Sequence, residues 1–233
     1  MKKVANYFFI FTLAILFAVC PLKSASAQVG GYIGIWGGYT ISPDASSGDY
    51  YDGGDYYYNF NLDIQETWVF GAKIGYTPPQ LKYLAFEFEY SYLKPDINSS
   101  IIDWHGYNFV AVEGDVKLNN FMFNAIVKYP QGRFHPYVGA GFGFSYADMS
   151  TIVTQRFSSV TSSASVGKDC TSFAWQLLTG VEIDITKNLS VDIGYRYFAT
   201  EIEFGNATEI DFENDAKTDF TTSMITLGLK FLF

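Results

Sequence analysis

The sequence is poor in cysteine, histidine and basic residues. It has two cysteines, two histidines and 15 lysines and arginines against 24 aspartates and glutamates, for a net charge of −9. That acidic excess argues against nucleic acid as a partner. Cys20 lies in the leader segment described next, so only Cys170 remains and no intrachain disulfide is predicted. An exported chain without such a cross-link needs a large sheet or core of its own.

The first 27 residues have the pattern of a secretory signal peptide. Lys2 and Lys3 precede an apolar run at 4–19, and a small-residue cleavage motif follows at 25–27. We predict that residues 1–27 are cleaved and that 28–233 form one domain. An uncleaved anchor is the alternative, but no second segment approaches the length of a membrane-spanning helix. Removal of the leader also removes three lysines and no acid, which increases the acidic excess.

Alternation with a period of two dominates the rest of the chain. In YLAFEFEYSYL, Phe86, Phe88 and Tyr90 fall on one face of a strand, and Glu87 and Glu89 fall on the other. Aromatic residues make up 19% of the chain, and similar patterns recur about eight times. The predicted strands lie near 29–41, 68–76, 84–92, 121–129, 138–146, 173–183, 189–197 and 225–233.

The connections between these segments alternate in length. Short ones lie at 77–82, 130–133 and 186–188, and long polar ones lie near 42–63, 97–111, 150–170 and 205–219. This layout predicts an all-β fold, an eight-stranded antiparallel up-and-down transmembrane β-barrel, with aromatic residues facing lipid. The short turns would face the periplasm. A soluble lipocalin-like barrel, with the faces inverted, is the structural alternative.

The inner face predicted for the barrel carries four acids and four bases. Equal numbers predict a paired network, because an unpaired ion in a narrow, dry interior costs several kcal/mol. Asp192 and Arg196 lie too far apart to pair with each other, so we expect their partners on adjacent strands. Gly139, Gly141 and Gly143 would make room for long side chains from across the barrel. The predicted network consists of Lys73, Glu87, Glu89, Lys128, Glu182, Asp192, Arg196 and Lys230.

Three stretches resemble the small outer-membrane β-barrel proteins of Gram-negative bacteria, the family that includes the OmpA transmembrane domain and the opacity proteins. They are FHPYVGAGFGFSYA (134–147), FAWQLLTGVEIDITKNLSVDIGYRYF (173–198) and TLGLKFLF (226–233). The resemblance implies an outer-membrane location and contact with lipid and lipopolysaccharide. It also implies a monomer without cofactors. Gly228, Phe231 and Phe233 resemble the signal that the barrel-assembly machinery reads.

Two groups of residues in the predicted loops are candidate sites of chemistry or binding. His105 with Asp103 could serve a rim-located hydrolase, but no positioned nucleophile accompanies them, and His135 is interpreted as a rim residue. The first long loop is rich in tyrosine and aspartate, a composition suited to binding a partner protein. Its candidate interaction residues are Asp49, Tyr50, Tyr51, Asp52, Asp55, Tyr56, Tyr57 and Tyr58. The three aspartates do not complete a calcium-loop pattern, so no metal site is predicted.

The sequence therefore predicts an integral outer-membrane barrel with a structural or surface-interaction role through its long loops. The partners expected are membrane lipid, lipopolysaccharide and an extracellular protein. A narrow passive channel for ions or small solutes is the alternative function. No enzymatic activity is predicted.

Overall fold

The computed structural model describes residues 29–47, 50–52, 56–58, 61–104, 108–157, 160–204 and 216–233. No helix that could cross a membrane is present among the described residues. Their strands are β1 (Gly30–Ser47), β2 (Tyr50–Asp52), β3 (Tyr56–Tyr58), β4 (Asn61–Ile64), β5 (Trp68–Thr77), β6 (Leu84–Leu93), β7 (Asp96–Trp104), β8 (Asn108–Lys128), β9 (Phe134–Phe157), β10 (Val160–Asp184), β11 (Leu189–Phe204) and β12 (Ala216–Leu232).

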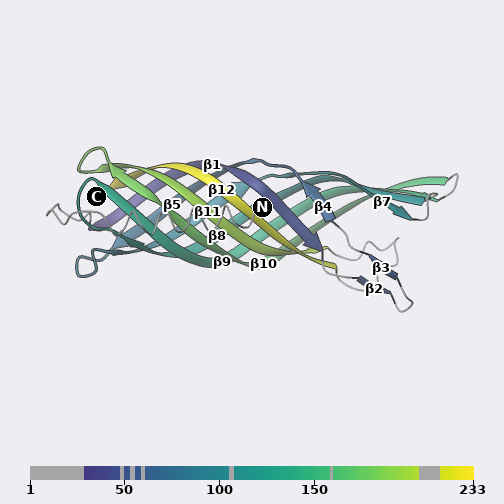
Figure 1. Ribbon diagram of the computed structural model, residues 1–233, viewed down its shortest axis with the longest axis horizontal. Helices are drawn as coiled ribbons and strands as arrows, with labels where there is room; N and C mark the ends of the chain where they lie inside the picture. Colours follow the sequence, from purple (N-terminus) through teal and green to yellow (C-terminus); the bar gives the residue numbers. More distant parts are fainter. Residues whose placement is uncertain are drawn as a thin grey trace, which may run out of the picture.

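Eight of these strands close into an antiparallel barrel (Figure 1). The strand order is β12-β11-β10-β9-β8-β6-β5-β1, and β1 also pairs with β12. That last pairing runs without interruption from Tyr32↔Leu232 to Tyr39↔Ile225. Because the ladder closes on itself, no strand edge is left unpaired in this part of the sheet, which a hydrocarbon environment requires. The predicted eight-stranded antiparallel barrel is therefore confirmed.

The strands β4 and β7 lengthen the barrel wall beyond β5 and β6. β4 pairs with β1 at Ala45↔Leu62 and with β7 at Ile64↔Ile97. β7 in turn pairs with β8. The break between β6 and β7 includes Pro95, which has no backbone N–H to donate to the ladder. Pro95 still accepts a hydrogen bond from Val116 N at 3.1 Å, so the wall continues past the break.

The sheet extends further than the sequence pattern predicted. β9 has 24 residues and β10 has 25, and they pair as far as Val160↔Phe157. The segments near 97–111 and 150–170 were predicted as loops and are mostly strand. Their composition gives the physical reason: seven of the 17 residues at 150–166 are threonine, isoleucine or valine, and these β-branched residues favour extended backbone. Polarity alone was a poor indicator of a loop here.

The three short connections agree with the prediction. β5 leads to β6 through 78–83, β8 to β9 through 129–133, and β10 to β11 through 185–188. In the last of these, Ile185 N donates to Leu189 O at 2.9 Å. The Thr186 hydroxyl accepts from the backbone N–H groups of Asn188 and Leu189 at 3.3 and 3.1 Å. A threonine that satisfies its own turn in this way allows the connection to be short.

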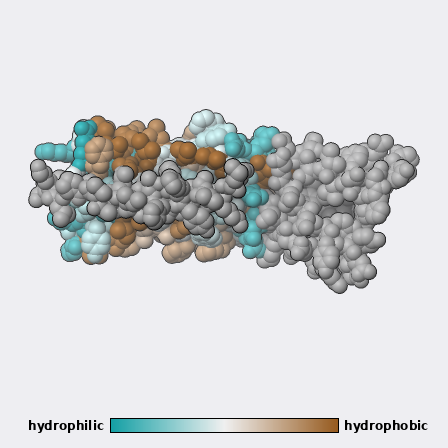
Figure 2. Space-filling view, in the orientation of Figure 1, coloured by the Kyte–Doolittle hydropathy of each residue, from teal (hydrophilic) through white to brown (hydrophobic). Residues whose placement is uncertain are grey.

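The two faces of the barrel wall separate as the alternation predicted. Phe86 and Phe88 are 50% and 40% exposed, whereas Glu87 and Glu89 between them are 5% and 1% exposed. Outward aromatic rings contact one another across strands, as Phe88 and Phe123 do at a centroid separation of 5.0 Å. Figure 2 shows hydrophobic residues on the barrel wall with hydrophilic residues to either side. Apolar residues outside and charges inside are the reverse of a soluble lipocalin-like barrel.

An arginine placed on this wall tests its contact with hydrocarbon. Phe88→Arg, at the middle of β6, should lower the free energy of unfolding by about 2–4 kcal/mol, because a cation at the bilayer midplane is poorly solvated. Phe134→Arg, at the first residue of β9, should lower it by about 0–1 kcal/mol, since the interface is wet. Urea titrations in phosphatidylcholine vesicles measure both. Equal losses at the two positions would contradict a lipid-facing wall at Phe88.

Candidate functional site

All eight charged residues predicted for the barrel interior are buried there. The most exposed of them, Lys73 and Asp192, are each 7% exposed. They come from β5, β6, β8, β10, β11 and β12, in the half of the barrel that is nearer the short turns. The alternation places them inside because each lies two or four residues from another inward residue on its strand. The interior is therefore an electrostatic site rather than a purely apolar core.

Ion pairs cross the interior from wall to wall. Arg196 on β11 pairs with Glu89 on β6, a strand four places away in the ring of eight. Lys73 on β5 bonds to Asp192 on β11 at 2.9 Å, three places away, and lies 3.4 Å from Glu87. An eight-stranded barrel is narrow enough for opposite side chains to meet. These pairs brace the barrel across its width.

The expectation that Asp192 and Arg196 pair with adjacent strands is wrong. Asp192 lies opposite Glu182 and Gly228 in the two neighbouring ladders, and neither offers a positive charge. Arg196 lies opposite Leu178 and Met224, which are apolar. Each charge therefore reaches across the lumen for its partner.

The fourth acid of the network is neutralised by a pair near the closure of the barrel. Lys230 on β12 pairs with Glu182 on β10. The Lys230 ammonium also lies 4.3 Å from the ring centroid of Tyr32, and that of Lys128 lies 6.0 Å from it. Rings at such distances stabilise a desolvated cation through their negative faces.

Three aromatic residues of the interior were not singled out from the sequence. Tyr32 donates to Glu87 Oε1 at 2.8 Å, and Tyr137 donates to Asp192 Oδ1 at 2.7 Å. The Arg196 guanidinium lies 3.9 Å from the ring centroid of Trp36. Each lies an even number of residues from another inward residue on β1 or β9, and this spacing could have identified it from the sequence.

Glycines on β5 make space for the two large rings of β1. A Cβ at Gly71 would overlap the Trp36 ring, and one at Gly75 would overlap the Tyr32 ring. On β9, a Cβ at Gly141 would overlap the Asn124 side chain of the adjacent strand β8, and one at Gly143 would overlap β8 backbone. The room made by the β9 glycines thus serves the neighbouring strand, not side chains from across the barrel as predicted.

Neutral polar side chains extend the network. Gln176 Nε2 donates to Glu89 at 3.2 Å and to Asn124 Oδ1 at 2.8 Å. Asn120 donates to Ser91 at 3.2 Å and accepts from the Ser145 hydroxyl at 2.7 Å. Glu89, on β6, therefore accepts hydrogen bonds from side chains of two other strands, β10 and β11.

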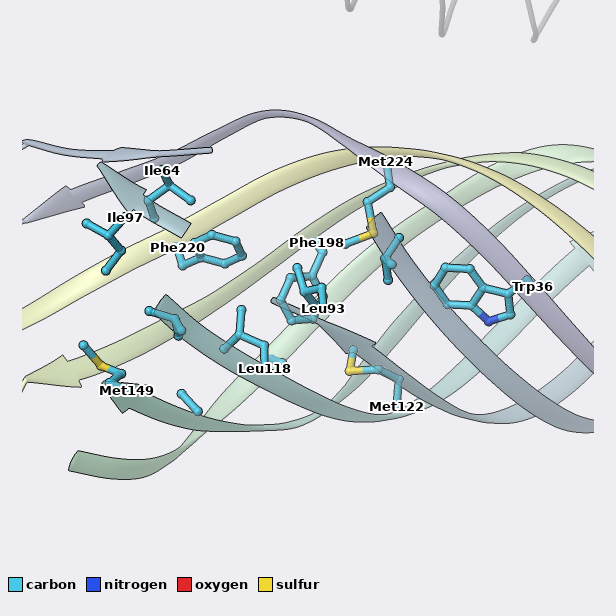
Figure 3. Close-up of a cluster of buried hydrophobic side chains, with 14 residues drawn as sticks. Trp36, Ile64, Leu93, Ile97, Leu118, Met122, Met149, Phe198, Phe220 and Met224 are labelled. Carbon is cyan, nitrogen blue, oxygen red and sulfur yellow. The ribbon is translucent and has the colours of Figure 1, made fainter. Parts of the chain in front are cut away.

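The outer half of the interior is an apolar core (Figure 3). Phe198 and Phe220 are each 1% exposed, and Leu93 and Leu118 are fully buried. Phe198 follows Arg196 by two residues on the same strand, so this core begins where the charged network ends. The sequence pattern predicted a charge-paired interior throughout, and the structure instead divides it into a charged and an apolar half. These apolar residues are separated by an even number of residues from the inward charges on their own strands, and this spacing could have predicted the apolar half.

His135 is the histidine whose surroundings the structure describes, and it lies buried at the short-turn end of the barrel. His135 is 2% exposed, its Nδ1 donates to Tyr129 O at 2.9 Å, and its Nε2 lies 3.0 Å from Asp184 Oδ2. Ser190 donates to the other oxygen of Asp184 at 3.0 Å. These contacts tie β9, β10 and β11 together at the short-turn end. His105 lies outside the described residues, and the side chain of Asp103 is not described.

The predicted loop surface is described only in its backbone. The strands β2 and β3 pair as Tyr50↔Tyr58, Tyr51↔Tyr57 and Asp52↔Tyr56. Asp49 and Asp55 lie outside the described residues. Within the described ranges, no group of three or more histidine, cysteine or acidic side chains could hold a metal ion.

The predicted assembly signal lies on the closing strand. Phe231 and Phe233 are 50% and 69% exposed on the outer wall, and Phe233 N donates to Gly31 O at 3.0 Å. Gly228 lies against the backbone and Cβ of β1, because a Cβ there would come within 3.1 Å of Trp36 Cβ. The segment thus completes the ladder that closes the barrel.

Comparisons with known proteins agree with this geometry. Residues 9–233 match the family described as outer membrane protein beta-barrel domain. An uncharacterized protein of Brucella abortus (strain 2308) is 38% identical over 89 residues, which are 37% of this chain and 31% of the relative. The chain therefore matches only about a third of that relative's length.

Solved structures resemble this chain at low sequence identity. The outer membrane protein OprG from Pseudomonas aeruginosa has a TM-score of 0.54 at 16% identity, covering 89% of this chain and 99% of OprG. Neisserial surface protein A has a TM-score of 0.47 at 18% identity, covering 88% of this chain and 97% of that protein.

Separating the Arg196–Glu89 pair should destabilise the barrel strongly. We expect Glu89→Gln to lower the free energy of unfolding by about 3–5 kcal/mol, because it leaves a buried guanidinium without its counter-ion. The double variant with Arg196→Met should lose less than the sum of the two single variants. Urea unfolding of the four proteins completes the cycle.

The control cycle uses an exposed pair of the same kind. Lys117 lies 3.4 Å from Asp148, and their side chains are 39% and 40% exposed. Lys117→Met and Asp148→Asn should show a coupling below about 1 kcal/mol. A coupling for Arg196–Glu89 as small as the control would refute the bracing role.

Proposed function

The chain belongs to the outer membrane protein beta-barrel domain family, and from this premise we propose that it acts as a sealed outer-membrane barrel. Its role in this proposal is to display a β-sheet outside the membrane and to reinforce the membrane, not to conduct solutes. The observation that carries the proposal is the Arg196–Glu89 pair, which joins opposite walls of the barrel. An ion or solute would have to break that pair to pass.

The apolar core adds a second barrier in series. Met122, Phe198 and Phe220 are each 1% exposed and belong to one packed cluster. Water and ions cross such a layer poorly, because its apolar side chains offer no hydrogen-bond partners and fill most of the width. A conduit for polar solutes would need both layers to rearrange.

The length of the strands supports a role outside the membrane. β8, β9 and β10 have 21, 24 and 25 residues, whereas about 9–11 residues of tilted strand cross a bilayer. About half of each strand therefore lies beyond the hydrocarbon, on the side away from the short turns. Such a sheet can hold a binding surface clear of the lipid headgroups.

The remaining partners follow from the surfaces of the barrel. In the proposal the aromatic wall contacts membrane lipid and lipopolysaccharide, and Gly228, Phe231 and Phe233 serve recognition by the assembly machinery. The tyrosine-rich segment around β2 and β3 belongs to the outer display surface. An extracellular protein is the partner class that a displayed sheet suits.

Conductance across planar bilayers tests the seal. We expect the wild-type protein, Glu87→Gln and Arg196→Gln to give currents equal to those of a protein-free bilayer, because the apolar core blocks the lumen even where the network is weakened. A heat-dependent shift in electrophoretic mobility verifies that each sample is a folded barrel. Discrete current steps in the wild type that change with Glu87→Gln would overturn the proposal in favour of a channel.

A further inference from the structure

A groove crosses the outer wall of the barrel at its closing seam, where β12 meets β1 (Figure 1). It has a volume of about 570 Å³ and is lined by residues of β11, β12, β1, β5 and β6, which follow one another in the ring of strands. One side of the groove is a row of five outward side chains that lie opposite one another in successive ladders. They are Leu189, Phe231, Ile33, Ile74 and Phe88.

A second row forms the other side of the groove, two residues farther from the short turns on each strand. It consists of Leu229, Ile35, Ala72 and Tyr90, again opposite one another in successive ladders. Ala72 is much smaller than its neighbours in this row, which leaves room in the groove there. Between the rows the floor is backbone, because Gly34 has no side chain and the buried side chains of Lys73 and Lys230 point into the barrel.

The groove extends from the short-turn edge of the wall to about its middle. Leu189 is the first residue of β11, directly after a short turn, whereas Phe88 lies halfway along the ten residues of β6. Neighbouring strands are about 4.8 Å apart, so a row across five strands is about 19 Å long. Because the strands tilt by roughly 35–45°, a row at right angles to them rises by about 11–14 Å along the membrane normal. One leaflet of the hydrocarbon core is about 15 Å thick, so the groove spans most of one leaflet.

The surfaces of the groove suit an acyl chain better than a protein segment. The side chains of both rows are apolar apart from the Tyr90 hydroxyl, which donates to Asn119 Oδ1 at 2.9 Å. On the floor, Gly34 lies in ladders with Lys230 on one side and Lys73 on the other, so the backbone there is already paired. A chain of methylene groups needs no hydrogen-bond partner and can gain van der Waals contact along the whole groove.

The short turns give this end of the barrel a positive charge. Each of the three contains one basic residue and no acidic one, although the whole chain has a net charge of −9. In the turn at 185–188 the basic residue is exposed and comes two residues before Leu189, at the lower end of the groove. Asp184, directly before this turn, points into the barrel and contacts His135. The three basic residues are Lys82, Arg133 and Lys187.

Hydrogen bonds fix the turn that carries Lys187. Asn188 Nδ2 donates to Leu232 O at 2.9 Å, and Leu232 N donates to Asn188 O at 2.9 Å. Both bonds hold the turn against β12, the strand that supplies Phe231 to the groove. The backbone of Lys187 is therefore held at the level where lipid headgroups meet the barrel, and an anionic headgroup complements its charge.

We propose that this groove binds one acyl chain of an anionic phospholipid from the leaflet on the short-turn side, with the headgroup phosphate at Lys187. The inference rests on the proposed function, since it assigns a site to the lipid that the outer wall contacts. It does not depend on whether the lumen conducts. Lipid labelling tests the groove and bilayer conductance tests the seal, so the failure of one is distinguished from the failure of the other.

Photolabelling of the full mature chain in phosphatidylcholine nanodiscs locates the lipid. The probe is phosphatidylglycerol with a diazirine in one acyl chain, present as a minor component, and adducts are mapped by mass spectrometry of peptides. We expect severalfold more adducts on 31–35 and 70–74 than on 123–127 and 138–142. The last two segments belong to the outward wall of β8 and β9, away from the groove.

The same labelled chain on phosphatidylcholine separates the headgroup contact from the acyl contact. One lysine near an anionic surface contributes an affinity of about fivefold, so labelling of the groove by phosphatidylglycerol should exceed labelling by phosphatidylcholine by about that factor. Lys187→Gln should bring the ratio to about one. The matched control is Lys82→Gln, in the short turn on the opposite side of the ring of strands. It should leave the ratio within about twofold of the wild-type value, because charges that far apart are screened.

Ala72→Phe tests the groove itself. The added ring would occupy the space between Ile35 and Tyr90, so adducts on the groove should fall to the level of the wall of β8 and β9. The matched control is Ala125→Phe, at an outward alanine of β8 that lies opposite Ala140. It should leave labelling of the groove unchanged. A heat-dependent shift in electrophoretic mobility verifies that each variant is a folded barrel.

Four outcomes overturn the proposal. They are adducts spread evenly over both parts of the wall, a wild-type preference for phosphatidylglycerol of about one, equal effects of the two lysine variants, and equal effects of the two alanine variants. The first two are measured on the wild-type protein, so they decide the matter even if a variant does not fold. Chemically cross-linked dimers that Ala72→Phe abolishes would also overturn it, in favour of a second copy of this chain in the groove.

Discussion

Every other feature of this protein depends on the closed backbone ladder of the barrel. In hydrocarbon an unpaired N–H or C=O group costs several kcal/mol, so a membrane-crossing sheet must have no edge. The pairing of β1 with β12 meets that requirement, and it completes a ring in which each of the eight strands pairs with both neighbours in a defined register. Register in turn decides which side chains face inward, because a shift by one residue exchanges the two faces. The charged network can form only in the register that the closure sets.

The division of the interior into a charged half and an apolar half follows from what each half must hold together. Near the short turns, the ion pairs of Arg196 with Glu89 and of Lys73 with Asp192 join walls that are three or four strands apart. Buried pairs of this kind are sensitive to geometry, because each charge left alone is costly. Farther out, Phe198 and Phe220 fill the same width without that sensitivity. The charged layer therefore depends on exact ion-pair geometry, whereas the apolar layer depends only on filling the space.

The sequence was sufficient to predict the barrel, because period-two alternation is a local property of each strand. The inward position of Glu87 and Glu89 follows from parity alone. The partner of Arg196 could not be predicted, because it depends on which strands face each other across the closed barrel. An ion-pair partner on an adjacent strand was predicted, but the residues opposite Arg196 in both neighbouring ladders are apolar. The apolar core could have been predicted. Leu93 and Phe198 are separated by an even number of residues from the inward charges on their own strands, so they fall on the same inner face.

The rule that closes the barrel also accounts for where it opens. The β10–β11 ladder ends at Ala174↔Thr200, next to Trp175, whose ring contacts Tyr197 at a centroid separation of 5.5 Å. Tryptophan and tyrosine gather where a membrane protein leaves the hydrocarbon. Beyond that level water can satisfy backbone groups, so the requirement for closure ends, and among the described residues β10 extends past its last ladder pair with β11. An interrupted ladder is then tolerated where water reaches the backbone, and it is excluded where the backbone would meet only lipid.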